Sequence, residues 1–204
     1  MGRVLALLYD RLGAASEEGG LREERRRLLA HARGEVVEIG AGTGRNLPLY
    51  PRDVTRLVAT EPDRHMVRRL RRKAHEAPMP IELVTAPAEA LPLPASSFDT
   101  VVGTLVLCTV SDPAAVLNEV ARLLRPGGRY LFLEHVRGHE PRLARWQDRL
   151  APVCAAIDGC HPNRATLAAL RASPLTVAEV HEGEIPKAAR LVRPMIAGVA
   201  ERPR

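Results

Sequence analysis

The sequence predicts an α/β fold: a single domain with a doubly wound, mostly parallel sheet of seven strands. Between residues 35 and 134, short β-branched runs alternate with stretches of helical periodicity. This alternation is typical of a parallel sheet wound by helices. The length of 204 residues fits one domain with its own core, and no internal repeat or linker divides the chain. We therefore expect one domain over residues 1–204.

Five strands are expected in the centre of the chain and two more near its end. The central ones cover residues 35–39, 56–61, 81–86, 99–104 and 129–134, and the late ones residues 175–181 and 192–199. We expect a helical cap over residues 1–34 and the ligand-binding core over 35–136. The remaining helices and the last two strands then occupy 137–204.

Two of the connecting helices have clear boundaries. Asp112 followed by Pro113 predicts an N-cap with proline at the first helical position, and Pro126-Gly127-Gly128 ends that helix. A later apolar series has a 3-4-3-4 spacing, which predicts an amphipathic helix interrupted at Pro152. Its members are Leu143, Trp146, Leu150, Val153 and Ile157.

The charge balance is basic, with a net charge of +6 and a pI of about 9.9. Arginines dominate it, in runs at residues 25–27 and 68–73 that fall in expected helices. Only three Tyr, two Phe and one Trp are available to stack on bases, so we expect no nucleic-acid partner. The alternative is an anionic partner such as a nucleic acid or a lipid headgroup.

Three cysteines, Cys108, Cys154 and Cys160, cannot form a framework of paired bridges. Reduced thiols, the absence of a convincing signal sequence and the lack of an apolar run of about 18 residues predict a cytoplasmic protein. Peripheral contact with a membrane remains an alternative. The sequence leaves the oligomeric state open.

A glycine-rich turn, Gly40-Ala41-Gly42-Thr43-Gly44, directly follows the first expected strand. A glycine turn between a strand and a helix is typical of a ligand-binding site. Glycines allow positive φ, and they let backbone N–H groups approach a ligand. Arg45 stands where a dinucleotide-binding motif has its third glycine. Glu38, just before the turn, would repel a pyrophosphate but attract an ammonium or sulfonium group. Glu61 ends the second strand, where an acid can accept both ribose hydroxyls.

Together with Ala88-Glu89-Ala90-Leu91-Pro92, Phe98-Asp99 and Leu124-Arg125-Pro126-Gly127-Gly128, these segments resemble the ordered motifs of class I S-adenosylmethionine (SAM)-dependent methyltransferases. The resemblance implies a Rossmann-like sheet with SAM as cofactor and S-adenosylhomocysteine as product. It implies that the glycines line the methionine part, that Glu38 lies near the amino group and that Glu61 holds the ribose. The further cofactor contacts it implies are Tyr9, Ala41, Asn46, Pro62, Met66, Ala88, Glu89, Thr104 and Leu105. Pro87 departs from the Asp that many of these enzymes use for adenine.

Five segments are similar to the branch that contains the alkyl-thiol methyltransferases and bacterial phospholipid N-methyltransferase-like proteins. They are Tyr9-Asp10, Gly44-Arg45-Asn46, residues 104–108, Glu134-His135 and Asp158-Gly159-Cys160-His161. The similarity implies transfer of a methyl group to a small acceptor such as a thiol or another lipophilic nucleophile. A phospholipid amine at a membrane surface is the alternative, and a non-catalytic SAM-binding module is a second one.

Two histidines are candidates for a general base that helps to form a thiolate. His135 ends the fifth strand, and His161 lies in the polar cluster after the amphipathic helix. For His135 a purely structural hydrogen bond is the alternative. We expect no metal at Cys160-His161, because a third and fourth ligand are missing at a suitable spacing, and Cys108 is expected in the core.

A nucleic-acid methyltransferase is a third possibility for the class. The Asn/Asp-Pro-Pro-aromatic signature of base amino methylation is absent after the fourth strand, where Thr104-Leu105-Val106-Leu107 stands.

Overall fold

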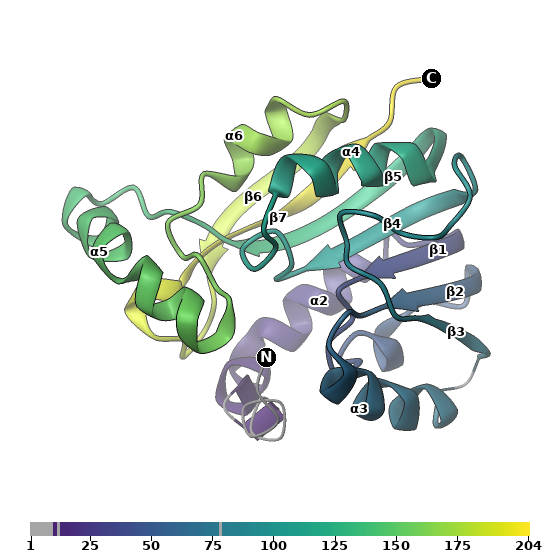
Figure 1. Cartoon of the computed structure of the whole chain (residues 1–204), viewed down its shortest axis with the longest axis horizontal. Coiled ribbons are helices and arrows are strands. Elements are labelled where there is room, and N and C mark those ends of the chain that lie inside the picture. Colours follow the sequence, from purple (N-terminus) through teal and green to yellow (C-terminus); the bar gives the residue numbers. More distant parts are fainter. Residues whose placement is uncertain (1–9, 12, 78) are drawn as a thin grey trace.

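A computed structural model describes residues 10–11, 13–77 and 79–204 of the chain. The centre of the fold is one seven-stranded sheet of order β3-β2-β1-β4-β5-β7-β6 (Figure 1). Strands β1 to β5 pair in parallel, and β7 runs antiparallel to both β5 and β6. The predicted fold class is therefore confirmed. The strands are β1 (Gly34–Ile39), β2 (Val54–Thr60), β3 (Ile81–Val84), β4 (Phe98–Thr104), β5 (Leu124–His135), β6 (Thr176–Glu184) and β7 (Pro194–Glu201).

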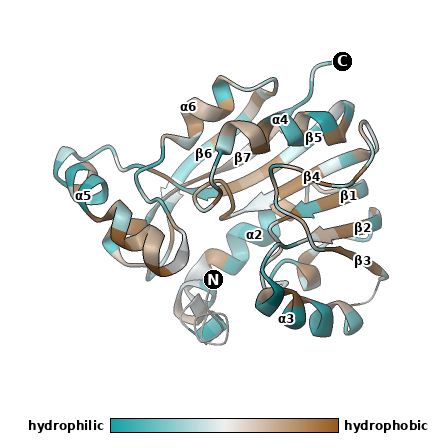
Figure 2. Cartoon of the chain, viewed as in Figure 1, coloured by the Kyte–Doolittle hydropathy of each residue, from teal (hydrophilic) through white to brown (hydrophobic). Residues whose placement is uncertain are grey.

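Helices cover both faces of this sheet (Figure 1). The short α6 (Thr166–Arg171) and α4 (Pro113–Leu123) pack on one face, while α2 (Arg22–Leu29) and α3 (Arg64–His75) pack on the other. Successive strand residues point to opposite faces of the sheet: Val37 packs on the side of α4 and α6, and Val36 on the side of α2 and α3. Figure 2 accordingly shows hydrophobic strands at the centre and hydrophilic residues along much of α3.

Side-chain caps fix the starts of α3 and α4. The Asp63 carboxylate accepts N–H bonds from His65 and Met66 at 2.8 and 3.1 Å. Asp112 accepts the equivalent bonds from Ala114 and Ala115 at 2.9 and 3.1 Å, as its place before Pro113 predicts. Both helices start beyond the carboxyl ends of strands, so the caps also shape that edge of the sheet.

Strand β5 begins earlier than expected, at Leu124 rather than at residue 129. The register with β4 shifts between Phe98 and Thr100, which creates an irregularity opposite Pro126-Gly127-Gly128. Gly127 has a φ of 77°, and its N–H donates to the Arg202 carbonyl at 2.9 Å. Helix α4 ends at Leu123, before the Pro126-Gly127-Gly128 segment that was expected to end it. That segment lies within β5 instead, because a backbone partner is present beside it.

Helix α5 (Pro141–Asp158) lies beyond the carboxyl ends of β4 and β5 (Figure 1). It continues through Pro152, where the sequence predicted an interruption. The predicted apolar face is also not the buried one. Ala144, Gln147 and Ala151 face the protein, whereas Trp146 and Ile157 are 55% and 62% exposed. The buried amide of Gln147 holds this face against the protein by bonds to backbone groups of Val136, Gly138 and Leu191.

The remaining short elements are η1 (Glu17–Leu21), η2 (Leu47–Leu49) and η3 (Arg190–Val192). Among the described residues, no helix has the length and apolar character needed to cross a bilayer.

Candidate active site

A cavity of about 410 Å³ opens at the carboxyl ends of the strands, beside the point where the chain order reverses between β1 and β4. Ligands bind at such switch points in open α/β sheets, and the volume is that of a small-molecule site. The cavity wall comprises Gly40, Gly42, Glu61, Pro62, Asp63, Met66, Pro87, Ala88, Glu89, Leu105, Val106, Cys108, Thr109, Val110, His135 and Cys160.

The glycine turn forms one wall because its conformation excludes side chains. Gly40 and Gly42 have φ values of 60° and 57°. A Cβ at Gly40 would lie 2.8 Å from a methyl of Val106, whereas one at Gly42 would meet nothing within 4 Å. Gly42 therefore faces open space where a ligand can approach the backbone. Gly44 instead faces Leu47 and Leu70 and serves packing.

Two backbone N–H groups hold the Glu61 carboxylate beside the glycine turn. Its Oε2 accepts the Gly42 N–H at 2.9 Å, and its Oε1 accepts the Asp63 N–H at 2.9 Å. Burial raises the pKa of this carboxyl, although the two N–H bonds oppose the shift. Each oxygen keeps a further lone pair, so the carboxylate is oriented to accept two hydroxyl groups from the cavity.

Glu38 lies behind the turn rather than on the cavity wall. It is 2% exposed, and it accepts bonds from Asn46 Nδ2 and the Tyr50 hydroxyl, both at 2.9 Å. Burial raises the pKa of Glu38 to about 7. Asn46 also donates to Thr104 Oγ1 at 3.0 Å. The structure thus places Glu38, Asn46 and Thr104 as a buried support for the turn, and a direct contact with cofactor stays a prediction for all three.

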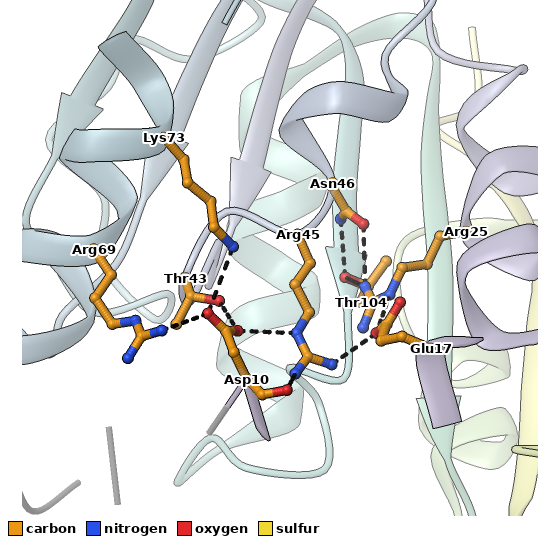
Figure 3. Close-up of polar contacts among 9 residues, drawn as sticks. All are labelled: Asp10, Glu17, Arg25, Thr43, Arg45, Asn46, Arg69, Lys73 and Thr104. Atoms are coloured by element: carbon orange, nitrogen blue, oxygen red, sulfur yellow. Dashed lines mark hydrogen bonds and ion pairs between the residues drawn. The ribbon is translucent and has the colours of Figure 1, made fainter. Parts of the chain in front are cut away.

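Buried Arg25 completes this support from α2 (Figure 3). Its Nη1 donates to Asn46 Oδ1 at 3.1 Å and to Thr104 Oγ1 at 2.7 Å, and its Nε to Glu17 at 3.1 Å. The arginine run at residues 25–27 therefore contributes one buried structural cation, which the sequence pattern did not distinguish from its exposed neighbours.

Asp10 joins the N-terminal helical segment to the glycine turn (Figure 3). Its carboxylate accepts the Thr43 hydroxyl at 2.6 Å and Arg45 Nε at 3.2 Å. From α3, Arg69 Nη2 bonds to the same carboxylate at 2.7 Å and Lys73 Nζ lies 3.6 Å away. Part of the second arginine run thus holds the turn in place. Tyr9, a predicted cofactor contact, lies outside the described residues.

The part of the wall formed by the loop after β4, which we call its other end although Val106 also contacts the glycine turn, has a different chemistry. Leu105, Val106 and Val110 line it, and Leu105 has a φ of 61°, a strained conformation for leucine. Buried Glu134 holds this loop, because its carboxylate accepts the N–H groups of residues 106, 107 and 108 at 2.9–3.2 Å. Burial raises the pKa of Glu134 to about 7.

His135 and two cysteines meet at this end. His135 Nδ1 lies 3.8 Å from Cys108 Sγ and 3.4 Å from Cys160 Sγ. Cys108 is buried, as the sequence predicts. The sequence offered no third ligand near Cys160 and so missed this cluster, because its members are 25 or more residues apart. His161 does not reach the wall: its N–H donates to the Cys108 carbonyl at 2.7 Å. Of the two candidate bases, the structure brings only His135 to the cavity.

Most of the predicted cofactor contacts come together on the wall. Those that line it are Gly40, Gly42, Glu61, Pro62, Met66, Ala88, Glu89 and Leu105. Those that do not are Glu38, Ala41, Gly44, Asn46 and Thr104. Near the expected adenine, Glu89 is held by the Ser111 N–H and hydroxyl at 3.1 and 2.8 Å. Pro87 is on the wall as well, so the departure from the usual Asp falls in the site itself.

The fold and the glycine turn, with an acid after β2 beside it, are those of a class I methyltransferase. A family model described as "Methyltransferase domain" matches residues 37–132. The human thiol S-methyltransferase TMT1A is 34% identical over 173 residues, which cover 81% of this chain and 69% of that protein. The chain belongs to this methyltransferase family and uses SAM as its cofactor.

A second relative and the solved structures agree with this assignment. The phosphatidylethanolamine N-methyltransferase of Cereibacter sphaeroides is 36% identical over 62% of this chain and 64% of its own length. This chain thus spans about two thirds of the relatives compared. A SAM-dependent methyltransferase from Thermotoga maritima shares the fold, with a TM-score of 0.71, 21% identity and coverage of 98% and 97%. A geranyl diphosphate C-methyltransferase from Streptomyces coelicolor, crystallised with S-adenosylhomocysteine, has a TM-score of 0.68 at 13% identity, covering 89% and 76%.

Proposed function

We propose that this methyltransferase acts on a small lipophilic thiol, which enters the apolar end of the cavity. The observation that carries the proposal is the meeting of His135, Cys108 and Cys160 with Leu105, Val106 and Val110 on one wall. Apolar side chains suit the body of a lipophilic acceptor and exclude water, while the sulfur and imidazole groups suit a thiol head. The thiol methyltransferase activity named for human TMT1A supports the same choice.

The residues at the other end fit SAM. Gly42 leaves open space at the backbone, and the fixed Glu61 carboxylate would accept the ribose hydroxyls. Pro62, Met66, Ala88 and Glu89 would surround the adenine. When bound, SAM supplies an activated methyl group on a sulfonium, so the protein contributes chiefly alignment and exclusion of water.

His135 is our candidate for ionising the acceptor. A free thiol has a pKa of about 8.5 and reacts as the thiolate, so a nearby imidazole that accepts the proton increases the reactive fraction at neutral pH. The Glu134 carboxylate, through its three N–H bonds, keeps the Val106–Cys108 loop in place opposite that imidazole.

The test is the formation of S-adenosylhomocysteine with a panel of alkyl thiols, amines and phenols. We expect product with thiols, together with the matching methyl thioether by mass spectrometry. Product with amines or phenols alone would overturn the thiol assignment. Measurable SAM affinity without product from any acceptor would favour the non-catalytic module.

A phospholipid amine is the second candidate, and one feature favours it. Helix α5 presents Trp146, Val153 and Ile157 to solvent, at 55%, 53% and 62% exposure, and Arg142, Arg145 and Arg149 are exposed on the same helix. Exposed apolar residues with flanking arginines bind anionic bilayer surfaces. Hydrophobic residues colour parts of α5 in Figure 2. The name of the Cereibacter relative supports a lipid amine as acceptor.

Vesicle flotation with phosphatidylglycerol-containing liposomes tests this candidate. We expect the wild type to float at low salt and Trp146→Ser to float less. Val180→Ser is a matched control, because Val180 is also exposed, at 37%, but lies on β6 away from α5. No flotation by the wild type would remove the membrane candidate.

We keep a cytoplasmic location and the absence of a nucleic-acid partner as proposals. The chain has three cysteines, too few for a framework of paired bridges, which supports a reducing compartment. The involvement of Arg25, Arg45 and Arg69 in internal bonds leaves fewer arginines for phosphates than the sequence suggests. A gel-shift assay at low salt tests for a nucleic-acid partner. A steep salt-dependent affinity for RNA or DNA would contradict its absence.

A further inference from the structure

The two cysteines and the histidine at the acceptor end form a compact set of metal ligands. Cys108 follows β4, His135 ends β5 and Cys160 follows α5. Their ligand atoms, two Sγ and Nδ1, lie within 4.8 Å of one another. Both cysteines are buried, at 1% and 4% exposure, and all three residues line the cavity.

The distances fit one small metal ion. Zinc binds Cys sulfur at about 2.3 Å and His nitrogen at about 2.0–2.1 Å in a tetrahedron, which separates sulfur from nitrogen by roughly 3.6 Å. The observed separations of 3.8 and 3.4 Å between His135 Nδ1 and the two sulfurs lie on either side of that value. We propose that Cys108, His135 and Cys160 bind a zinc ion whose fourth position opens into the cavity and takes the acceptor thiolate.

The chemistry of the ligand set also selects zinc. Two thiolates and an imidazole are soft and borderline ligands, which favour Zn²⁺ over Mg²⁺ or Ca²⁺. Two thiolates would balance the charge of the ion. Three protein ligands with one open position are typical of catalytic rather than structural zinc.

The backbone already fixes the segments that carry these ligands. Glu134 accepts the Cys108 N–H at 3.2 Å, and the His161 N–H donates to the Cys108 carbonyl at 2.7 Å. The second bond ties the Cys160-His161 turn to the loop after β4. A site whose supports are in place needs little rearrangement to accept an ion.

This inference rests on the proposed thiol substrate and replaces the His135 imidazole by the metal as the group that ionises it. As the acceptor binds, its S–H bond breaks, the sulfur coordinates zinc and the proton leaves to solvent. The coordinated thiolate then forms a bond to the methyl carbon, the bond from that carbon to the sulfonium sulfur breaks, and its electron pair stays on the departing thioether, S-adenosylhomocysteine. The methylated acceptor is a neutral thioether and a weak ligand, so it dissociates. In this form the metal, rather than the imidazole of His135, generates the nucleophile.

Metal analysis tests the site without reference to activity. The full chain, purified with a phosphine reductant and stripped by a chelator, is titrated with Zn²⁺ and separately with Co²⁺. We expect one Zn²⁺ per chain, and for Co²⁺ the intense visible bands and sulfur charge-transfer bands of a tetrahedral thiolate site. Addition of an alkyl thiol should shift those bands if the fourth position is open.

Variants decide whether these three residues are the ligands. Cys108→Ser, Cys160→Ser and His135→Gln should each weaken zinc affinity at least 100-fold. Cys154→Ser is the matched control, because it removes the third thiol from α5, outside the cluster, and should bind like the wild type. No stoichiometric metal in the wild type, or equal affinity in Cys160→Ser, would overturn the proposal. Circular dichroism of each variant checks that it is folded.

Failure of the zinc site and failure of the thiol function give different results. If the stripped, metal-free enzyme methylates thiols at the wild-type rate, the zinc proposal falls and the thiol function stands. If zinc binds in stoichiometric amounts but no thiol is methylated, the site stands and its role toward the acceptor falls. A Cys108–Cys160 disulfide in protein kept under reductant would contradict the metal site directly.

Discussion

The two ends of the cavity are built in different ways. The cofactor end contains the turn after β1 and the acid after β2, and backbone N–H groups orient that acid. The acceptor end combines side chains from three distant positions, Cys108, His135 and Cys160. On our proposal, the contacts of Gly42 and Glu61 with SAM are encoded by their positions after neighbouring strands, whereas the chemistry at the acceptor depends on the tertiary fold. Changes at each end should therefore alter different steps.

The largest effect is expected at the acceptor end. His135→Ala should lower kcat with a thiol by about 100-fold or more, because general-base catalysis contributes about 10²–10⁴. Its Kd for SAM should change less than twofold, because the residue lies beyond the cofactor contacts. Stopped-time assays and calorimetry measure the two quantities. Wild-type turnover would return His135 to a structural role.

At the cofactor end, Glu61→Ala should weaken SAM binding by at least about 100-fold. The substitution removes two charge-assisted hydrogen bonds to hydroxyls, each contributing about 1.5–3 kcal/mol. It also frees the N–H groups of Gly42 and Asp63, so the turn should become less ordered. Titration calorimetry checks the affinity, with Glu35→Ala as a control, because Glu35 lies at the start of β1 and the glycine turn follows the end of that strand. Unchanged affinity would refute the ribose assignment.

Glu38 gives a pH-dependent stability that is independent of the acceptor. Burial raises its folded-state pKa from 4.5 to about 7, so the folded protein holds a proton that the unfolded chain loses at lower pH. The contribution of Glu38 is therefore fully present below pH 4.5 and is lost as pH rises to about 7, in total about 3 kcal/mol. Urea unfolding of wild type and Glu38→Gln at several pH values isolates this term.

Between pH 4.5 and 7, the free energy of unfolding should change less with pH in Glu38→Gln than in the wild type. Parallel curves for the two proteins would show that Glu38 titrates alike in the folded and unfolded chains. The comparison must use protein free of SAM, since a bound ammonium group near the turn would favour the charged carboxylate.

Two glycines of the same turn should separate binding from packing. Gly42→Ala places a methyl in open cavity space and should weaken SAM binding by about 10-fold. Gly44→Ala brings a Cβ within 2.9 Å of Leu47 and 3.0 Å of Leu70, so it should mainly lower the free energy of unfolding. Both adopt positive φ, which costs about 1 kcal/mol for alanine. Equal effects of the two variants on Kd would contradict this division.

Much of the fold was predictable from sequence because its signals are local. The alternation of strands and helices and the cap at Asp112 come from neighbouring residues, and the structure agrees with both. The extension of β5 to Leu124 was not predictable, because it depends on pairing of Gly127 with distant Arg202. The exposed face of α5 was also mispredicted, since periodicity locates an apolar stripe without saying whether another element covers it.

The site divides in the same way. Gly42 and Glu61 could be located by their positions after β1 and β2, and both reach the cavity wall. The role of Asp10 in holding Thr43, Arg45 and Arg69 was missed, because these hydrogen bonds join segments more than 30 residues apart. The cluster of Cys108 with His135 was missed for the same reason. The one available signal was that Cys108 follows, and His135 forms, the carboxyl end of one of two adjacent strands, β4 and β5.

The central claim, that the two ends act separately, is tested most directly by a kinetic double-mutant cycle. Rates with SAM and an alkyl thiol are measured for wild type, Glu61→Ala, His135→Ala and the double variant. The structure predicts that Glu61→Ala raises KM for SAM, that His135→Ala lowers kcat, and that the two effects on kcat/KM multiply within about twofold. A double variant no worse than the poorer single variant, or both single variants changing the same constant, would contradict the account.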